Sequence, residues 1–291
     1  MADKRVPFMK MNGCGNDFIV VDNRQGILDG FVLAEFVKNV CARGTSLGAD
    51  GFMMLEASDT ADFTMRYFNA DGSEGEMCGN GARCIARFAS LVGAAGDRMR
   101  FETLAGVYQA QIDARSQTVK VKFPDVALGD LVLSQPYEKA EPAPRYHYGF
   151  VGVPHSVWFV DRVAEIPDRQ IVEWGRQIRY DVRRFPQGAN VNFLEVLNRH
   201  ALRIRTYERG VEAETLACGS GSPAAAIVAG ILDMVDAASP VDVHTRGGVL
   251  RISFELTEDT ATEVYLEGNA RLVARGELLP EAWESSCWEN A

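Results

Sequence analysis

Two cysteines stand in the same setting, each directly before a Gly-x-Gly turn: Cys78 in EMCGNG and Cys218 in LACGSG. In both places a strand-like run and a polar turn precede the thiol, and a helical pattern follows it. The free N–H groups at a helix start attract anions and lower the pKa of a nearby thiol. We therefore expect both thiols to have pKa values below the usual value of about 8.5.

A pair of thiols on opposite sides of a bound molecule can invert a carbon centre. One thiolate removes a proton from one face, and the second thiol returns a proton from behind, which is general acid–base catalysis without a cofactor. Two like charges so close together suppress double ionisation, so the pair is expected to hold one proton. The two helix starts are expected to bind the substrate carboxylate and stabilise the negative charge that develops beside it.

The chain repeats itself weakly but in order, at a constant spacing. Four features recur: GADG at 48 and GANV at 188, Tyr67 and Tyr207, Glu74 and Glu214, and Cys78 and Cys218 (218 − 78 = 140). Such a repeat predicts a duplicated domain. We expect the two copies to face each other across a cleft, with the two cysteines on opposite sides of one substrate.

Short strands and four helices are the elements that must position these thiols. Runs rich in β-branched and aromatic residues predict strands at 18–22, 52–56, 63–68, 118–123, 157–161, 202–207, 249–254 and 262–268. Apolar spacing predicts helices at 33–40, 85–92, 171–178 and 224–235. The last helix is apolar almost all round and should be buried. The stretch 137–146, with three prolines, is interpreted as a connecting loop.

Bulk properties exclude several classes of protein. The chain has 291 residues, and a prior of roughly 150 residues per domain indicates two domains. The net charge of −10 argues against a sequence-independent nucleic-acid binder. No apolar run reaches the roughly 18 residues of a membrane span, and no signal peptide is recognisable, so a cytoplasmic protein with reduced cysteines is expected. Without a C-x-x-C pair, a metal site is not expected.

Other interpretations compete for the same residues. Four cysteines are interpreted as small buried hydrophobes: Cys14, Cys41, Cys84 and Cys287. A redox disulfide between Cys78 and Cys218 is an alternative to acid–base chemistry. The stretch 219–224 nominally fits a dinucleotide-binding loop but lacks the preceding buried strand and the distant acidic residue. His155 can be a packed core histidine, and Glu208 with Arg209 a surface pair.

Four longer motifs together resemble the diaminopimelate epimerases, over about residues 6 to 276. They are KMNGCGNDFIVVD, FNADGSEGEMCGNGARC, FPQGANVNF and YERGVEAETLACGSG. The resemblance implies a pyridoxal-independent isomerase that converts LL- to meso-diaminopimelate in lysine and peptidoglycan-precursor biosynthesis. A racemase of another amino acid, of the histidine or proline type, is the alternative on the same scaffold. A homodimer is a possible assembly of the chain.

The family's architecture is a further expectation. The resemblance implies an α+β fold of two pseudo-symmetric domains, each a curled mixed β-sheet around a central helix, with the active site between them. We expect residues 1–124 plus 275–291 to form the domain that carries Cys78. Residues 125–274 then form the domain that carries Cys218.

The resemblance also implies roles for individual residues. Cys78 and Cys218 match the acid–base pair, and His155 and Glu208 match positions that tune the thiols. The implied substrate-binding residues are Asn16, Asn69, Gly79, Asn80, Asn190, Glu208, Arg209, Gly219 and Ser220. A guanidinium suits the distal carboxylate because it can bind it in a bidentate way. No cofactor, metal, nucleic acid or membrane is implied as a partner.

The chain departs from the family pattern at a few positions. Val153 stands where relatives often have Asn, and Gly51 where some have Gln. The stretch between ERG and ET is one residue longer than is usual. Ser222-Pro223 replaces a smaller pair, which is a mild change because proline fits the first turn of a helix. The first two changes remove polar groups, so recognition of the distal end of the substrate stays open.

Overall fold

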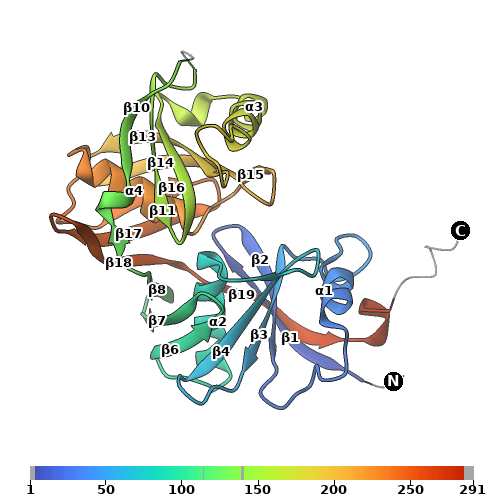
Figure 1. Ribbon diagram of the computed structural model, residues 1–291. Coiled ribbons are helices and arrows are strands. Elements are labelled where there is room, and N and C mark those ends of the chain that lie inside the picture. Colours follow the sequence, from blue (N-terminus) through green and yellow to red (C-terminus); the bar gives the residue numbers. More distant parts are fainter. Residues whose placement is uncertain (1–3, 114, 139–140, 285–291) are drawn as a thin grey trace, which may run out of the picture. The chain divides into compact units, whose positions relative to one another are not determined.

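The structure is a computed structural model that describes residues 4–113, 115–138 and 141–284 (Figure 1). It divides into unit 1, Met1–Val121 and Asn269–Ala291, and unit 2, Lys122–Gly268. The boundaries expected from the sequence lie three residues (125 − 122) and six residues (275 − 269) further along the chain. Asn269 already belongs with unit 1, because its side-chain oxygen accepts a hydrogen bond from Cys14 N and its carbonyl one from Arg83 Nε.

Unit 1 is built mainly from strands. They are β1 (Val6–Gly13), β2 (Asn16–Asp22), β3 (Gly51–Glu56), β4 (Phe63–Asn69), β5 (Glu74–Gly75), β6 (Arg98–Thr103), β7 (Gly106–Ile112), β8 (Thr118–Lys122) and β19 (Arg271–Leu278). Helices α1 (Leu33–Cys41) and α2 (Gly79–Leu91) and the short 3-10 helix η3 (Pro280–Ala282) complete it. Strand β19 pairs antiparallel with β1 and so joins the two ends of the chain in one sheet (Figure 1).

Unit 2 has a similar composition of elements. Its strands are β9 (Val126–Ala127), β10 (Val132–Pro136), β11 (Arg145–Val151), β12 (Val153–Phe159), β13 (Asn190–Asn198), β14 (Ala201–Glu208), β15 (Ala213–Thr215), β16 (Val241–Thr245), β17 (Gly248–Leu256) and β18 (Thr260–Asn269). Its helices are α3 (Asp168–Arg179) and α4 (Gly221–Ile231), with 3-10 turns η1 (Leu128–Asp130) and η2 (Val163–Glu165).

The order of strand pairings is the same in the two units. In unit 1 the pairs are β1–β2 antiparallel, β2–β3 parallel, β3–β4 and β4–β5 antiparallel, β4–β6 parallel and β6–β7 antiparallel. In unit 2 the series runs β11–β12, β12–β13, β13–β14, β14–β15, β14–β16 and β16–β17, with the same directions. The strand pairing of each unit is therefore mixed, and the fold is α+β as predicted.

One helix in each unit packs against most of its strands. Helix α2 contacts β1, β2, β3, β4 and β7, and α4 contacts β11 to β14, β16 and β17. Nearly every residue of α4 is buried, as its all-round apolar pattern predicts. It ends at Ile231 rather than near 235, because Asp233 adopts a left-handed conformation (φ 53°) that leaves the helix. Pro223 lies in the first turn of α4 without interrupting it.

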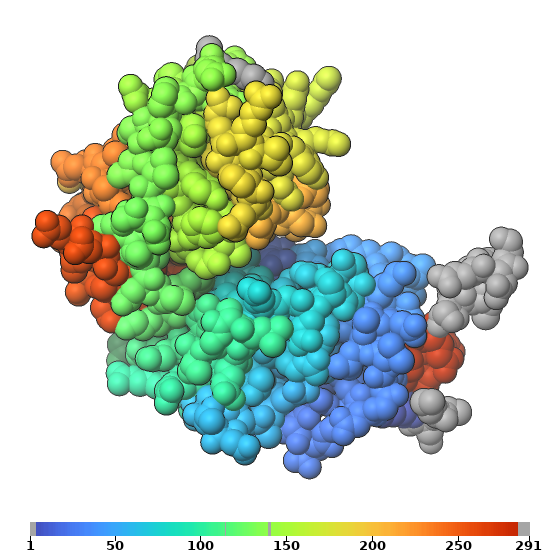
Figure 2. All heavy atoms as spheres, in the orientation of Figure 1, coloured from blue at the N-terminus to red at the C-terminus, as the bar shows by residue number. Residues whose placement is uncertain are grey.

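A C-terminal segment completes the core around α1. Figure 2 shows the red atoms of this segment beside the blue atoms of the early part of the chain. Asn39 Nδ2 donates to the carbonyl of Trp283 at 2.8 Å, and the Trp283 ring lies 5.6 Å from that of Phe36. Apolar burial thus joins segments that are far apart in the sequence.

Most sequence-based predictions of elements agree with the structure. Each of the eight predicted strand runs overlaps a strand, and each of the four predicted helices overlaps a helix. The predicted loop 137–146 is wrong at its end, since Arg145 and Tyr146 already pair in β11, and residues 139–140 lie outside the described part. In the part of the chain that the structure describes, no helix is long and apolar enough to cross a membrane.

Candidate active site

Cys78 caps the central helix of unit 1. It is extended (φ −134°, ψ 118°), and its Sγ accepts a hydrogen bond from Gly81 N at 3.5 Å. This contact satisfies one of the N–H groups that have no partner within the helix. Gly81 leaves little room for a side chain, because a Cβ there would lie 3.0 Å from Met53 Sδ. The helix start predicted at this thiol is therefore confirmed.

Cys218 has the same relation to α4. Its Sγ accepts from Gly221 N at 3.4 Å, and the residue is 5% exposed. A Cβ on Gly221 would lie 2.4 Å from Asn192 Oδ1 and 3.2 Å from Cys218 Sγ. Only glycine fits this close approach. Both thiols thus accept an N–H from the glycine three residues further on.

The predicted lowering of the thiol pKa is wrong for Cys218. Burial raises the pKa of this thiol, and the nearby Glu208 carboxylate raises it further. The Gly221 N–H opposes both effects but does not outweigh them. Desolvation also raises the pKa of the Glu208 carboxyl group, which is hydrogen-bonded to Cys218 and Thr215. Cys218 is therefore a neutral thiol that is hydrogen-bonded to the Glu208 carboxyl group.

Three of the four remaining thiols are inert by burial. Cys14, Cys41 and Cys84 are buried, as predicted, and Cys287 lies outside the described residues. Burial raises the pKa of Cys41 and of Cys84 to about 12. These thiols are packing groups rather than nucleophiles.

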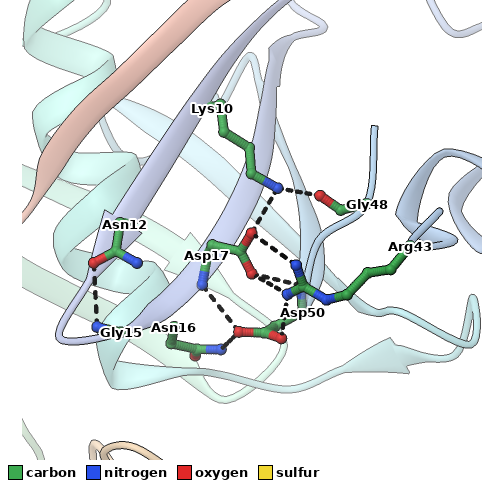
Figure 3. A network of polar contacts seen from close by, with 8 residues as sticks. All are labelled: Lys10, Asn12, Gly15, Asn16, Asp17, Arg43, Gly48 and Asp50. Atoms are coloured by element: carbon green, nitrogen blue, oxygen red, sulfur yellow. Dashed lines mark hydrogen bonds and ion pairs between the residues drawn. The ribbon is translucent and has the colours of Figure 1, made fainter. Parts of the chain in front are cut away.

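Asn16 lies directly beside Cys78. Its Oδ1 accepts from the Cys78 thiol at 3.7 Å, a long contact typical of sulfur, while its Nδ2 donates to Asp50 Oδ2 at 2.8 Å. Because Asp50 takes the amide nitrogen, the carbonyl oxygen is the atom turned toward the thiol. Figure 3 shows Asn16 held in this way at the start of β2.

The carboxylate that orients Asn16 belongs to a balanced ion network (Figure 3). Lys10 Nζ lies 2.7 Å from Asp17, and Arg43 Nη2 lies 2.5 Å from Asp17 and 2.7 Å from Asp50. Burial raises the pKa of Asp17, but hydrogen bonds from Lys10 and Arg43 outweigh this and bring it to about 2. Two carboxylates and two cations leave the network neutral. No sequence pattern pointed to Asp50 or to this network.

Asn69 is the last residue of β4, and its side chain is hydrogen-bonded to residues of β4 and of the turn that follows it. Its Oδ1 accepts from Tyr67 Oη at 2.8 Å, and its Nδ2 donates to Ser73 Oγ at 3.0 Å. Gly51 lies opposite it in β3, and a Cβ there would lie 2.8 Å from the Tyr67 ring. The tyrosine ring occupies the space of a side chain at Gly51, and its hydroxyl supplies a polar group to Asn69.

Gly79 and Asn80 form the first turn of α2, and the side chain of Arg83 donates hydrogen bonds to both of them. Arg83 Nη1 donates to Gly79 O at 3.1 Å, and Nη2 donates to Asn80 Oδ1 at 2.9 Å. The arginine is completely buried. Sequence reasoning missed it, although its place one helical turn after Gly79 was a usable signal.

In unit 2 the structure brings Asn190 and Arg209 together. Asn190 Oδ1 accepts from Arg209 N at 2.8 Å, and Arg209 Nη1 donates to Gln187 O at 2.8 Å. Glu208 and Arg209 are neighbours at the end of β14, but Glu208 turns toward Cys218. They are therefore not the ion-paired surface couple of the alternative interpretation.

His155 is buried on β12, and among the described residues its hydrogen-bond contact is with Asn192 and not with a thiol. Its Nδ1 lies 3.2 Å from Asn192 Nδ2, while Asn192 Oδ1 accepts from Thr206 Oγ1 at 3.0 Å. Burial first, and then the charge of Arg209, lower the pKa of His155 to about 3, so the ring is neutral. Within the described residues its Nε2 has no hydrogen-bond partner, and the residue borders a cavity of about 10 Å³. That is space for at most one water.

Asn192 is a second residue that the sequence analysis missed. It is fully buried and joins His155 to the start of α4, where its Oδ1 faces Gly221. Side chains alternate along a strand, so Asn192 shares a face of β13 with Asn190, and this spacing of two was the available signal.

In residues 4–113, 115–138 and 141–284, no group of three His, Cys, Asp or Glu side chains could hold a metal.

Comparisons with known proteins give one family. A family model described as diaminopimelate epimerase matches residues 8–128 and 148–273. The chain is 41% identical over 290 residues to a diaminopimelate epimerase of Aquifex aeolicus, covering 95% of this chain and 99% of that protein. It is 42% identical over 283 residues to one of Archaeoglobus fulgidus, covering 94% and 96%.

Solved structures with much lower identity share the fold. A phenazine biosynthesis protein of the PhzF family from Bacillus anthracis matches with a TM-score of 0.73 at 17% identity, covering 95% of this chain and 99% of that one. At this identity the likeness speaks for the fold alone, which the two-unit α+β architecture above already displays.

Proposed function

Because the chain belongs to the diaminopimelate epimerase family, we propose that it converts LL-2,6-diaminopimelate to the meso isomer by inverting one α-carbon. The reaction is a cytoplasmic step in lysine and peptidoglycan-precursor synthesis. One observation carries the proposal beyond the family likeness: Cys78 and Cys218 each accept an N–H from the start of a central helix. The same order of strand pairings around both helices supports two pseudo-symmetric, duplicated domains.

The reaction needs one proton shared by two thiols. A thiolate takes the α-proton, breaking the C–H bond and forming S–H. The other thiol gives its proton to the opposite face of the carbon, breaking its own S–H bond and becoming the thiolate. The pair holds one proton before and after, so no cofactor takes part. Cys218, neutral beside Glu208, is ready to be the donor.

The helix starts are proposed to hold the reacting α-carboxylate. The N–H groups of a first helical turn have no partner within the helix and attract anions. In unit 1 these residues are Gly79 and Asn80, and in unit 2 Gly219 and Ser220. Fixed N–H groups there also stabilise the negative charge that builds up as the proton leaves.

The rest of the substrate needs ligands for two ammonium groups and a distal carboxylate. We propose that amide and carboxylate side chains serve the ammonium groups and that Arg209 binds the distal carboxylate. The residues proposed for this are Asn16, Asn69, Asn190, Glu208 and Arg209. His155 and Glu208 are proposed to tune the thiols. For Glu208 the support is its hydrogen bond to Cys218, and for His155 it is a neutral ring with a spare Nε2–H.

The test is turnover in deuterated water. Incubation with LL-diaminopimelate should give meso product carrying one deuterium at the inverted α-carbon, since the returned proton comes from a thiol that exchanges with solvent. Histidine and proline serve as controls for the alternative racemases. Absence of labelled meso product from folded, reduced protein, or faster turnover of proline or histidine, would refute the proposal.

Arg209→Ala should weaken binding more than it slows chemistry. A bidentate pair of charge-assisted hydrogen bonds is lost, so KM should rise on the order of 10²-fold while kcat changes much less. Arg209→Lys keeps the positive charge but loses the two parallel N–H donors of the guanidinium, and its KM should rise by about tenfold. Steady-state kinetics with both isomers measure this. The exposed Arg176 of α3 provides a control, since Arg176→Ala should leave KM unchanged. An unchanged KM for Arg209→Ala would remove this residue from the substrate site.

A further inference from the structure

Arg83 carries a buried positive charge without a carboxylate. It is 0% exposed, and its guanidinium bonds neutral oxygens: Gly79 O, Asn80 Oδ1 and Asn269 O. Among the ion pairs of the described residues, none includes Arg83. Burying an unpaired charge is costly, even when every N–H is hydrogen-bonded. A neutral side chain at position 83 would avoid this desolvation free energy, so the presence of an arginine there indicates a functional role.

The neighbouring thiols do not supply the missing negative charge. Arg83 is hydrogen-bonded to the Cys14 thiol, yet burial raises the pKa of Cys14 despite the guanidinium. Cys84 is fully buried, and burial raises its pKa as well. Both groups stay neutral at physiological pH, so they are hydrogen-bonding neighbours and not counter-ions.

The charged groups on the elements packed around α2 are already paired. The pairs are Lys10 with Asp17 on β1 and β2, Asp22 with Arg24, Arg66 of β4 with Glu56 of β3 and with Glu74, and Arg43 with Asp50. Tyr108 of β7 is neutral, since burial and the charge of Glu76 raise its pKa. Glu76 is an exposed carboxylate, where solvent screens its charge. Arg87, further along α2, adds a second cation rather than an anion.

The guanidinium lies against the residues that follow Cys78. Its two Nη atoms bond Gly79 and Asn80, which belong to the first turn of the helix. A fixed cation here adds to the partial positive charge of the helix start. Asn16 Oδ1 lies 3.7 Å from Cys78 Sγ and acts in the opposite direction. The Asn16 amide is a neutral dipole, whereas the guanidinium carries a full charge.

In unit 2 the equivalent helix start has no arginine at the position of Arg83, and its thiol lies beside an acidic group instead. At the repeat spacing, the position that corresponds to Arg83 is Pro223 (83 + 140 = 223), which has no charge. Cys218 instead has the Glu208 carboxylate as its neighbour. The two thiols therefore have surroundings of opposite sign, a buried cation for Cys78 and a carboxyl group for Cys218.

We infer that Arg83 is a positioning residue whose buried charge stabilises the Cys78 thiolate and whose fork holds Gly79 and Asn80, so that the resting protein keeps the shared proton on Cys218. The assignment deepens the proposed function, on which its role in turnover rests. Cys78 is then the base of the free enzyme, and the positive charge of Arg83 also favours the reacting α-carboxylate of the substrate at this helix start. The charge effect itself is a property of the free protein and needs no substrate.

The experiment follows alkylation of each cysteine by iodoacetamide against pH in the ligand-free full chain, with peptide mass mapping. Cys78 should react with a lower pH midpoint than Cys218. In Arg83→Gln the Cys78 midpoint should rise by about one unit, which is about tenfold slower alkylation at a fixed lower pH. Arg83→Lys keeps the charge and should stay close to wild type. Arg87→Gln removes a cation further along α2 and serves as the matched control.

A second variant avoids altering the buried arginine. Asn80→Asp places a carboxylate on Arg83 Nη2 and should raise the Cys78 midpoint in the same direction as Arg83→Gln. Circular dichroism and an unreactive Cys41 establish that each variant is folded. Equal midpoints for wild type, Arg83→Gln and Asn80→Asp would overturn the inference, as would equal shifts for Arg83→Gln and Arg83→Lys. If the Cys78 midpoint shifts as expected in these variants but the wild-type chain does not epimerise diaminopimelate, the proposed function is wrong and the effect of the Arg83 charge on Cys78 is still supported.

Discussion

Cys78→Ala and Cys218→Ala should each reduce net epimerisation by about 10²–10⁴-fold or more, since a positioned acid or base contributes that much and the pair acts as one unit. Each thiol accepts the N–H of a helix start, so alanine removes the acid–base group and leaves the helix in place. A single remaining thiolate can still remove and return a proton on its own face. Each variant should therefore retain some α-hydrogen exchange with one stereoisomer and little with the other, in opposite sense for the two variants.

Exchange and turnover of both variants with LL- and meso-diaminopimelate measure this. Cys41→Ala is the matched control, because Cys41 is a buried thiol of unit 1 far along the chain from the motif and its loss should spare turnover. Binding should suffer less than turnover, since the helix starts at Gly79 and Gly219 remain. If either variant epimerises within tenfold of wild type, that cysteine is neither acid nor base.

Glu208→Gln should reduce kcat on the order of 10²-fold and lower the pKa of Cys218. Burial and the Glu208 charge both raise that pKa in the wild type, and the substitution removes the second of these causes. The alkylation midpoint of Cys218 should therefore move to lower pH, while that of Cys78 stays in place. An amide at 208 can still accept the thiol's hydrogen bond, so the effect reports charge rather than packing.

The same substitution should change stability in a pH-dependent way. Desolvation raises the pKa of Glu208 in the folded protein, so ionising it costs folding free energy as pH rises through the folded pKa. Glu208→Gln removes this cost, and its melting temperature should exceed that of wild type at neutral pH and converge with it in acid. Glu255→Gln, at an exposed position of β17, should change neither property. A Cys218 midpoint that stays unchanged or rises would show that Glu208 does not control this thiol.

The helix starts at the two thiols could be predicted because capping is a local matter. A polar turn, a cysteine and two glycines determine which N–H groups are free and where backbone can approach, all within one short motif. The repeat spacing likewise needs no knowledge of contacts. It predicted that Cys78 and Cys218 lie in equivalent places, and the structure places both at the start of a central helix.

Strands whose residues alternate between apolar and polar could also be predicted from the sequence. Strands that form because of pairing with distant segments could not. β19 is recognisable as a strand mainly because it pairs with β1, which lies near the opposite end of the chain, and its own residues are largely exposed. The return of the chain to unit 1 at Asn269 depends on hydrogen bonds to Cys14 and Arg83, which no sequence pattern announces.

The charge state of the site was decided by tertiary structure. The helix start by itself predicts a lowered pKa at Cys218, but desolvation by the surrounding elements and the charge of Glu208 raise this pKa instead. The same holds for Arg83, an ordinary helical arginine by sequence, which packing removes from solvent and which forms no ion pair with the described residues. Residue types and spacing determined which atoms could do the chemistry. Burial, which depends on every element packed around these atoms, decided the direction in which the pKa of Cys218 is shifted.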